Sequence, residues 1–130
     1  MRTLVVVDAA NVVGSVPDGW WKDRRGAAER LRDALVPYAE EGLPGLPGLP
    51  GLSLSGPLEL VLVVEGAARG IESVPGVEVD SAPAVGDDRI VELAAAAAGR
   101  PCVVVTADRE LRRRVGEVGA QCAGPRAVRP

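Results

Sequence analysis

The chain has 130 residues, 47% of them apolar and 25% charged, which is enough apolar material for the core of one domain. It contains no histidine, and this excludes Ser-His-Asp and Cys-His catalysis and zinc sites that use histidine. The formal net charge is −3, yet residues 100–130 carry seven basic and three acidic side chains, a distribution that admits an anionic partner near that end.

Other classes of protein are disfavoured by what the sequence lacks. The two cysteines show no CxxC pairing, and two cannot form a zinc site alone. We find no signal peptide and no run of about 20 apolar residues. We therefore expect a single cytoplasmic domain over 1–130 that makes no contact with a membrane.

The N-terminal half predicts two strands around one helix. The β-branched run over 3–7 is typical of a strand buried on both faces, and it ends at Asp8, after which no helix signal follows directly. Residues 27–38 have apolar side chains at helical spacing, and Pro37 should kink or end that helix. A second apolar run over 58–64 ends at Glu65. The helix should bury Leu31, Ala34, Leu35 and Tyr38.

A low-complexity segment interrupts this half. Residues 42–57 repeat Leu-Pro-Gly three times and then diverge from the repeat. Proline and glycine oppose both helix and strand ladder, so the segment predicts a mobile surface loop without a function of its own.

The C-terminal half predicts alternating strands and helices. A short strand over 77–79 precedes a helix over 88–98 that opens at Gly86-Asp87-Asp88, and a strong strand over 102–105 ends in Thr106-Ala107-Asp108. A basic helix follows, with Gly119 suited to the position after its end, and residues 120–123 can form a last short strand. The helix over 88–98 should bury Ile90, Val91, Ala94, Ala97 and Ala98, and the basic helix Leu111, Val115 and Val118.

This order of elements predicts an α/β fold. Apolar strands alternating with amphipathic helices favour three layers, α/β/α, around a mostly parallel sheet of four to five strands. Right-handed crossovers then bring the carboxyl ends of all the strands to one edge of the sheet, where such folds bind ligands.

Carboxylates stand at that edge. Asp8, Glu65 and Asp108 each follow a strong strand, and Asp87 and Asp88 open the helix that leads into the third. Carboxylates gathered without histidine suit Mg²⁺ or Mn²⁺, whose charge would offset their repulsion. Each also has a plain structural interpretation, since Asp87 and Asp108 could cap helices and Glu65 could be an ordinary loop residue. Their joint placement favours a metal site.

Asn11 and Thr106 add support for a metal site at this edge of the sheet. Asn11 lies three positions after Asp8, and Thr106 supplies a hydroxyl two residues before Asp108. A strand followed by D-x-x-N, an acidic helix start and a later strand followed by [ST]-x-D-x-x-[LF] resemble the PIN-like nuclease superfamily, most closely its NYN branch.

The resemblance implies a PIN-like fold and a Mg²⁺- or Mn²⁺-dependent phosphodiesterase that usually acts on RNA. Matched by position, Asp8 and Asp108 are metal-binding acids, Asn11 the motif asparagine and Thr106 the helper hydroxyl. Asp87 or Asp88 matches the central acid, with Asp88 slightly preferred. Glu65 falls where some members carry a further acid.

Basic residues flank this constellation on two sides. Arg109, Arg112 and Arg113 follow Asp108 and could bind phosphate, although such a run is more often a solvated helix face. Lys22 and Arg24 lie beside Trp20 and Trp21, which could stack on a base or simply pack the loop.

We therefore expect a divalent-metal-dependent ribonuclease with RNA as its partner. The same carboxylates could instead hydrolyse a nucleoside triphosphate, or the domain could bind RNA or act as a scaffold without catalysis. A homodimer and an antitoxin-like protein partner both remain open.

Overall fold

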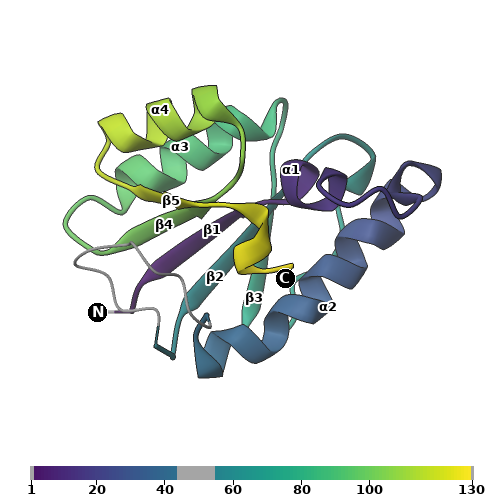
Figure 1. The fold of residues 1–130 in the computed structure, drawn as a ribbon, viewed down its shortest axis with the longest axis horizontal. Coiled ribbons are helices and arrows are strands. Elements are labelled where there is room, and N and C mark those ends of the chain that lie inside the picture. Colours follow the sequence, from purple (N-terminus) through teal and green to yellow (C-terminus); the bar gives the residue numbers. More distant parts are fainter. Residues whose placement is uncertain (1, 44–54, 130) are drawn as a thin grey trace.

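The computed structural model describes residues 2–43 and 55–129, and most of the Leu-Pro-Gly segment lies outside them. Five parallel strands form one sheet in the order β3-β2-β1-β4-β5 (Figure 1). The predicted strands are all present, with bounds shifted by at most two residues at either end. They are β1 (Leu4–Asp8), β2 (Glu59–Val64), β3 (Val77–Ser81), β4 (Cys102–Val105) and β5 (Gln121–Ala123).

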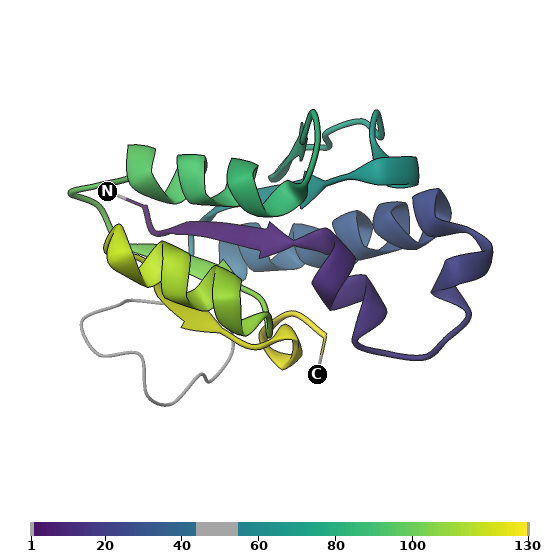
Figure 2. The same ribbon diagram turned by 90° about the horizontal axis from the view of Figure 1, so that it is seen from above.

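Helices cover both faces of the sheet, which gives the predicted three layers (Figure 1). One face is covered by α1 (Ala9–Gly14) and α2 (Arg24–Glu41), and the other by α3 (Gly86–Ala96) and α4 (Arg109–Glu117). Figure 2 shows α3 and α4 running next to one another across the sheet, with α2 behind it. The single turns η1 (Trp20–Lys22), η2 (Gly66–Ala68) and η3 (Pro125–Ala127) lie in the connections. None of the described helices is long and apolar enough to cross a membrane.

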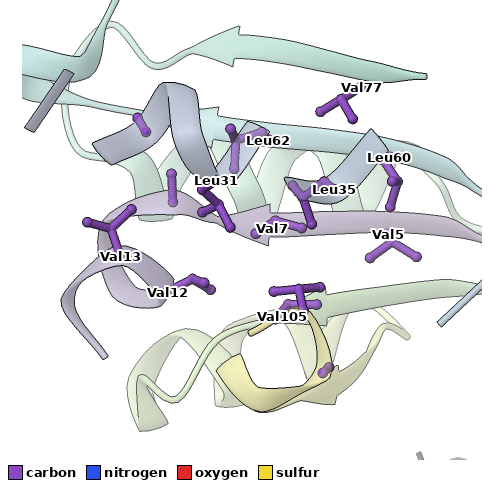
Figure 3. Packing of buried hydrophobic residues seen from close by; sticks show 14 of the residues in the cluster. Val5, Val7, Val12, Val13, Leu31, Leu35, Leu60, Leu62, Val77 and Val105 are labelled. Carbon is purple, nitrogen blue, oxygen red and sulfur yellow. The ribbon is translucent and has the colours of Figure 1, made fainter. Parts of the chain in front are cut away.

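Two apolar clusters, one on each face of the sheet, form the core because successive strand side chains point to opposite faces. Val5 and Val7 of β1 pack with Leu31 and Leu35 of α2 (Figure 3), whereas Val6 packs beneath α3 and α4. All five side chains are fully or almost fully buried. The continuous apolar strands are therefore explained by a sheet covered on both sides.

Of the two outcomes predicted at Pro37, an end to the helix is wrong, because α2 continues to Glu41. Proline removes one backbone donor and cannot bond the carbonyl of Asp33, but both residues are exposed, so that carbonyl is open to water. The buried Leu35 and Ala39 on either side hold the helix against the sheet. The burial predicted for Ala34 and Ala98 is also wrong, since both side chains are exposed.

The structure adds a helix that the sequence did not signal. α1 begins directly after Asp8, whose side chain serves as its N-cap. Within six residues this helix carries Asn11, and it buries Val12 and Val13 against α2 and the sheet (Figure 3).

Candidate active site

The strand order places a topological switch point between β1 and β4, and we call the region outside the carboxyl ends of these two strands the crevice. The chain leaves β1 toward β2 on one side and leaves β4 toward β5 on the other, so β1 and β4 flank the topological switch point of the sheet. Connections diverge there, and open α/β sheets bind ligands at the carboxyl ends of those strands. Asp8 ends β1, and Thr106 follows β4 directly. The predicted site residues of these two strands therefore meet at the crevice.

A buried hydrogen-bond chain joins the two strand ends. The Thr106 hydroxyl donates to Oδ2 of Asp8 at 2.9 Å and accepts from the backbone N–H of Asp108 at 3.1 Å. Thr106 is fully buried and both functions of its hydroxyl are used, so it positions the two acids and cannot touch a substrate.

Asn11 and Arg112 fix the turn after β4. The side-chain oxygen of Asn11 accepts from the backbone N–H of Ala107 at 2.8 Å, which ties α1 to that turn. Nε of Arg112 donates to the carbonyl of Thr106 at 2.8 Å. Arg112, proposed from sequence to bind substrate, thus holds its own backbone turn in place.

Asp8 and Asp108 each cap a helix that begins at the crevice. Oδ1 of Asp108 accepts from the N–H of Leu111 at 2.9 Å, and Oδ1 of Asp8 accepts weakly from the N–H of Asn11 at 3.5 Å. Capping and a role at the site are compatible, because a carboxylate has lone pairs on two oxygens. Asp87 caps nothing, since the N-cap of α3 is Val85.

Four carboxylates interact electrostatically at this edge, and we call Asp8, Glu65, Asp87 and Asp108 the acidic cluster. Burial raises the pKa of Asp8 to about 6, and the charges of Asp87 and Glu65 add to the rise against the hydrogen bond from Thr106. Burial also raises the pKa of Asp87, and Asp108 and Glu65 raise it further. The cluster is therefore a site of concentrated negative charge.

The structure brings Asp87 into this cluster and directs Asp88 elsewhere. Asp88 is exposed and forms an ion pair with Arg114 of α4 at 2.9 Å. The sequence analysis slightly favours Asp88 as the central acid, whereas the geometry of the structure favours Asp87. Gly86, just before them, is buried with the Glu65 carboxylate so near that an added Cβ would lie 3.1 Å from its Oε1.

The cluster has the chemistry of a site for a hard divalent cation, with oxygen donors only and opposing positive charge supplied mainly by Arg114. Among the described residues, however, no three such side chains surround one point closely enough to hold an ion directly. Binding would require a change of side-chain rotamer or bridging water, and Mg²⁺ usually keeps several waters when it binds to a protein.

The predicted basic residues divide into those near the cluster and those away from it. Arg109 is exposed beside Asp108 and forms no ion pair within the described parts of the chain. Arg113 lies on the outer face of α4, where it pairs with Glu110 and Glu117, so the structure does not bring it to the site. Lys22 is exposed on η1, and none of its described contacts joins it to the cluster.

Arg24 and Trp20 lie close to the acidic cluster on the α2 side. The Arg24 guanidinium carbon is 5.3 Å from the centroid of the Trp20 ring, and Trp20 packs partly into the core. Both line a pocket that also includes Glu65. Trp21 is 52% exposed and meets Trp20 edge to face.

The C-terminal segment supports α1 in a way that the sequence did not indicate. Arg129 donates to the carbonyls of Val12 and Val13 at the end of α1 and forms an ion pair with Asp18 at 2.9 Å. The contact spans more than a hundred positions, and no local pattern predicts it.

Comparison with known proteins bears on the fold alone. No protein-family model matches the sequence, and no curated protein matches it. Two crystal structures of Rae1 (YacP) from Bacillus subtilis are similar, with TM-scores of 0.68 for one and 0.66 for its W164L mutant. Their identities to this chain are 20% and 19%, and each alignment covers 95% of this chain and 70% of Rae1. The expected three-layer α/β fold is therefore confirmed, and these solved structures share it.

Proposed function

We propose that the protein is a ribonuclease that depends on Mg²⁺ or Mn²⁺ held by the acidic cluster. The observation that carries the proposal is the gathering of Asp8, Glu65, Asp87 and Asp108 at the switch point of the sheet, with the pKa values of Asp8 and Asp87 raised. Mutual repulsion of this kind costs stability unless a cation offsets it, which is typical of functional sites.

Asp8, Asp87 and Asp108 would hold the metal, with Glu65 as a further donor. A divalent ion bound there would lower the pKa of water and stabilise the charge that develops on a phosphodiester, chemistry that needs no histidine. Thr106 and Asn11 act as positioning residues, because one bridges the two acids and the other ties α1 to the turn before Asp108.

Arg109 is the arginine best suited to bind a substrate phosphate. It is exposed in the first turn of α4, next to Asp108. Arg24 and Glu65 line one pocket, and from there Arg24 could contact the RNA next to the bound phosphodiester.

The test compares cleavage of end-labelled RNA by the wild type, Asp8→Asn and Asp108→Asn, each with Mn²⁺, Mg²⁺ or EDTA. Both variants should lose activity by at least roughly a hundredfold, because removal of even an outer-shell partner of a metal costs up to that factor, and EDTA should abolish it. Asp33→Asn, an exposed aspartate on α2, is the matched control and should cleave as the wild type does.

Other results would replace this function with another. Cleavage that survives both substitutions or EDTA would refute the metal site as its origin. Phosphate or pyrophosphate released from free nucleotides, with RNA intact, would identify a nucleotide hydrolase. Binding of RNA without turnover would identify a noncatalytic RNA-binding domain.

A further inference from the structure

A pocket of about 240 Å³ opens beside the acidic cluster, between α1, the start of α2 and η2. It is continuous with the candidate site, because Ala9 and Ala10 follow Asp8 directly and Glu65 lines the pocket as well as belonging to the cluster. The metal chemistry proposed above makes no use of this space.

The lining of the pocket combines small, aromatic and charged groups. Its floor and sides come mainly from alanines of α1, α2 and η2, whose short side chains leave the space open. Trp20 supplies an aromatic ring held in place by the core and by Trp21, and the Arg24 guanidinium lies over that ring.

The size and charge of this pocket limit the kind of ligand that it can bind. The volume is below the roughly 300–1,000 Å³ of pockets that hold drug-sized ligands, so it suits one small ring system. A phosphate is disfavoured, because the single cation Arg24 is opposed by the Glu65 carboxylate on the same lining. A flat, neutral heterocycle with polar edges fits best, since it can stack on an indole or guanidinium face and donate to a carboxylate.

We propose that this pocket receives one unpaired nucleobase of RNA, next to the phosphodiester at the acidic cluster. The proposal rests on the proposed ribonuclease function. It makes the Trp20–Arg24 pair a stacking platform and gives the enzyme a requirement for unpaired RNA at one position beside the cut. RNA-binding proteins commonly splay single-stranded bases onto such platforms.

The first experiment measures kcat/KM for RNA oligonucleotides that each carry one abasic nucleotide, placed at successive positions around the cut. At one position beside the cut, the abasic nucleotide should lower kcat/KM by about 5- to 100-fold, the range expected for the loss of one stacked base. Ala67→Met, which fills the pocket from the exposed η2 turn, should lower kcat/KM on intact RNA by a similar factor and remove the position dependence.

Ala95→Met is the matched control, since Ala95 is exposed on α3 across the sheet from the pocket and should leave kcat/KM unchanged. Equal losses at every abasic position, or an Ala67→Met enzyme as active as the wild type, would overturn the proposal.

A binding experiment separates failure of the pocket from failure of the nuclease. In a Trp21→Phe background, Trp20 fluorescence should be quenched by short oligoadenylate but not by the matched abasic strand, and Ala67→Met should remove the quenching. Quenching without any RNA cleavage would refute the nuclease and keep the base site. Cleavage without base-dependent quenching would refute the base site and keep the nuclease.

Discussion

The Asp8 side chain is buried, accepts a hydrogen bond and lies close to the negative charges of other carboxylates. It is 5% exposed, and its pKa rises from 3.8 to about 6. In the folded protein Asp8 therefore keeps its carboxyl proton at pH values where Asp8 in the unfolded chain has released it. The wild type pays in stability at neutral pH for keeping a carboxylate where a cation would bind.

We predict that Asp8→Asn stabilises the protein at pH 7 in EDTA. The free energy of unfolding of the wild type should fall, relative to the variant, as pH rises from about 4 to about 6, by at most about 3 kcal/mol. Asparagine is also a good N-cap, so α1 should keep its start. Chemical denaturation across this pH range checks the difference, with Asp33→Asn as the control. A difference that does not change with pH would contradict the raised pKa.

Thr106 should act through Asp8 and Asp108 and not on the substrate. Thr106→Val keeps the buried shape but leaves the Asp108 N–H without its acceptor, at a cost of about 1–3 kcal/mol. It also removes the hydrogen bond that lowers the pKa of Asp8, so the pH at which cleavage is half-maximal should move upward. Thr106→Ser should restore both properties. A pH profile unchanged in Thr106→Val would leave this residue with a packing role only.

At the scale of elements, α4 shows how one residue serves both fold and site. Asp108 is the N-cap of a helix whose buried side is only Leu111 and Val115. Asp108→Ala should lower the free energy of unfolding by about 1 kcal/mol, whereas Asp108→Asn retains the cap and should lose little. Both should lose RNA cleavage. Thermal melts together with cleavage assays check this pair, and activity retained by Asp108→Asn would mean that its charge is not needed.

The strands β1, β2 and β4 and the helices α2, α3 and α4 could be predicted from sequence because their apolar patterns are continuous or regular, whereas β3 and β5 gave only short signals. α1 could not be, since its six residues are too few for a helical period and its cap, Asp8, also ends a strand. The sequence allowed α2 to end at Pro37, because the pattern does not reveal that the carbonyl left without its hydrogen bond faces water.

The site could be predicted in outline and not in detail. That Asp8, Glu65 and Asp108 share an edge follows from parallel topology alone. Whether Asp87 or Asp88 faces them depends on helix rotation and on Arg114, which lies 26 positions from Asp88 in the chain. The pairing of Arg113 with its own helix neighbours is equally a matter of side-chain direction.

At the scale of the whole molecule, the strand order determines where the candidate site lies. The connections from β1 and β4 diverge, and acids at the ends of β1 and β2, at the start of α3 and in the β4–α4 turn converge there. Arg129 also links the C-terminal segment to α1 through hydrogen bonds to carbonyls at the end of that helix. A fold of this kind places the charge of distant segments at one crevice.

We propose that this crevice binds a divalent cation through Asp8 and its neighbours. Isothermal titration calorimetry with Mn²⁺ near pH 6, in buffers of different ionisation enthalpy, tests it most directly. We predict that the wild type binds Mn²⁺ with release of protons, because the cation displaces the proton that the raised pKa keeps on Asp8. Asp8→Asn should bind Mn²⁺ much more weakly and without that release, and Asp33→Asn should bind it as the wild type does. No binding by the wild type, or equal binding by Asp8→Asn, would contradict it.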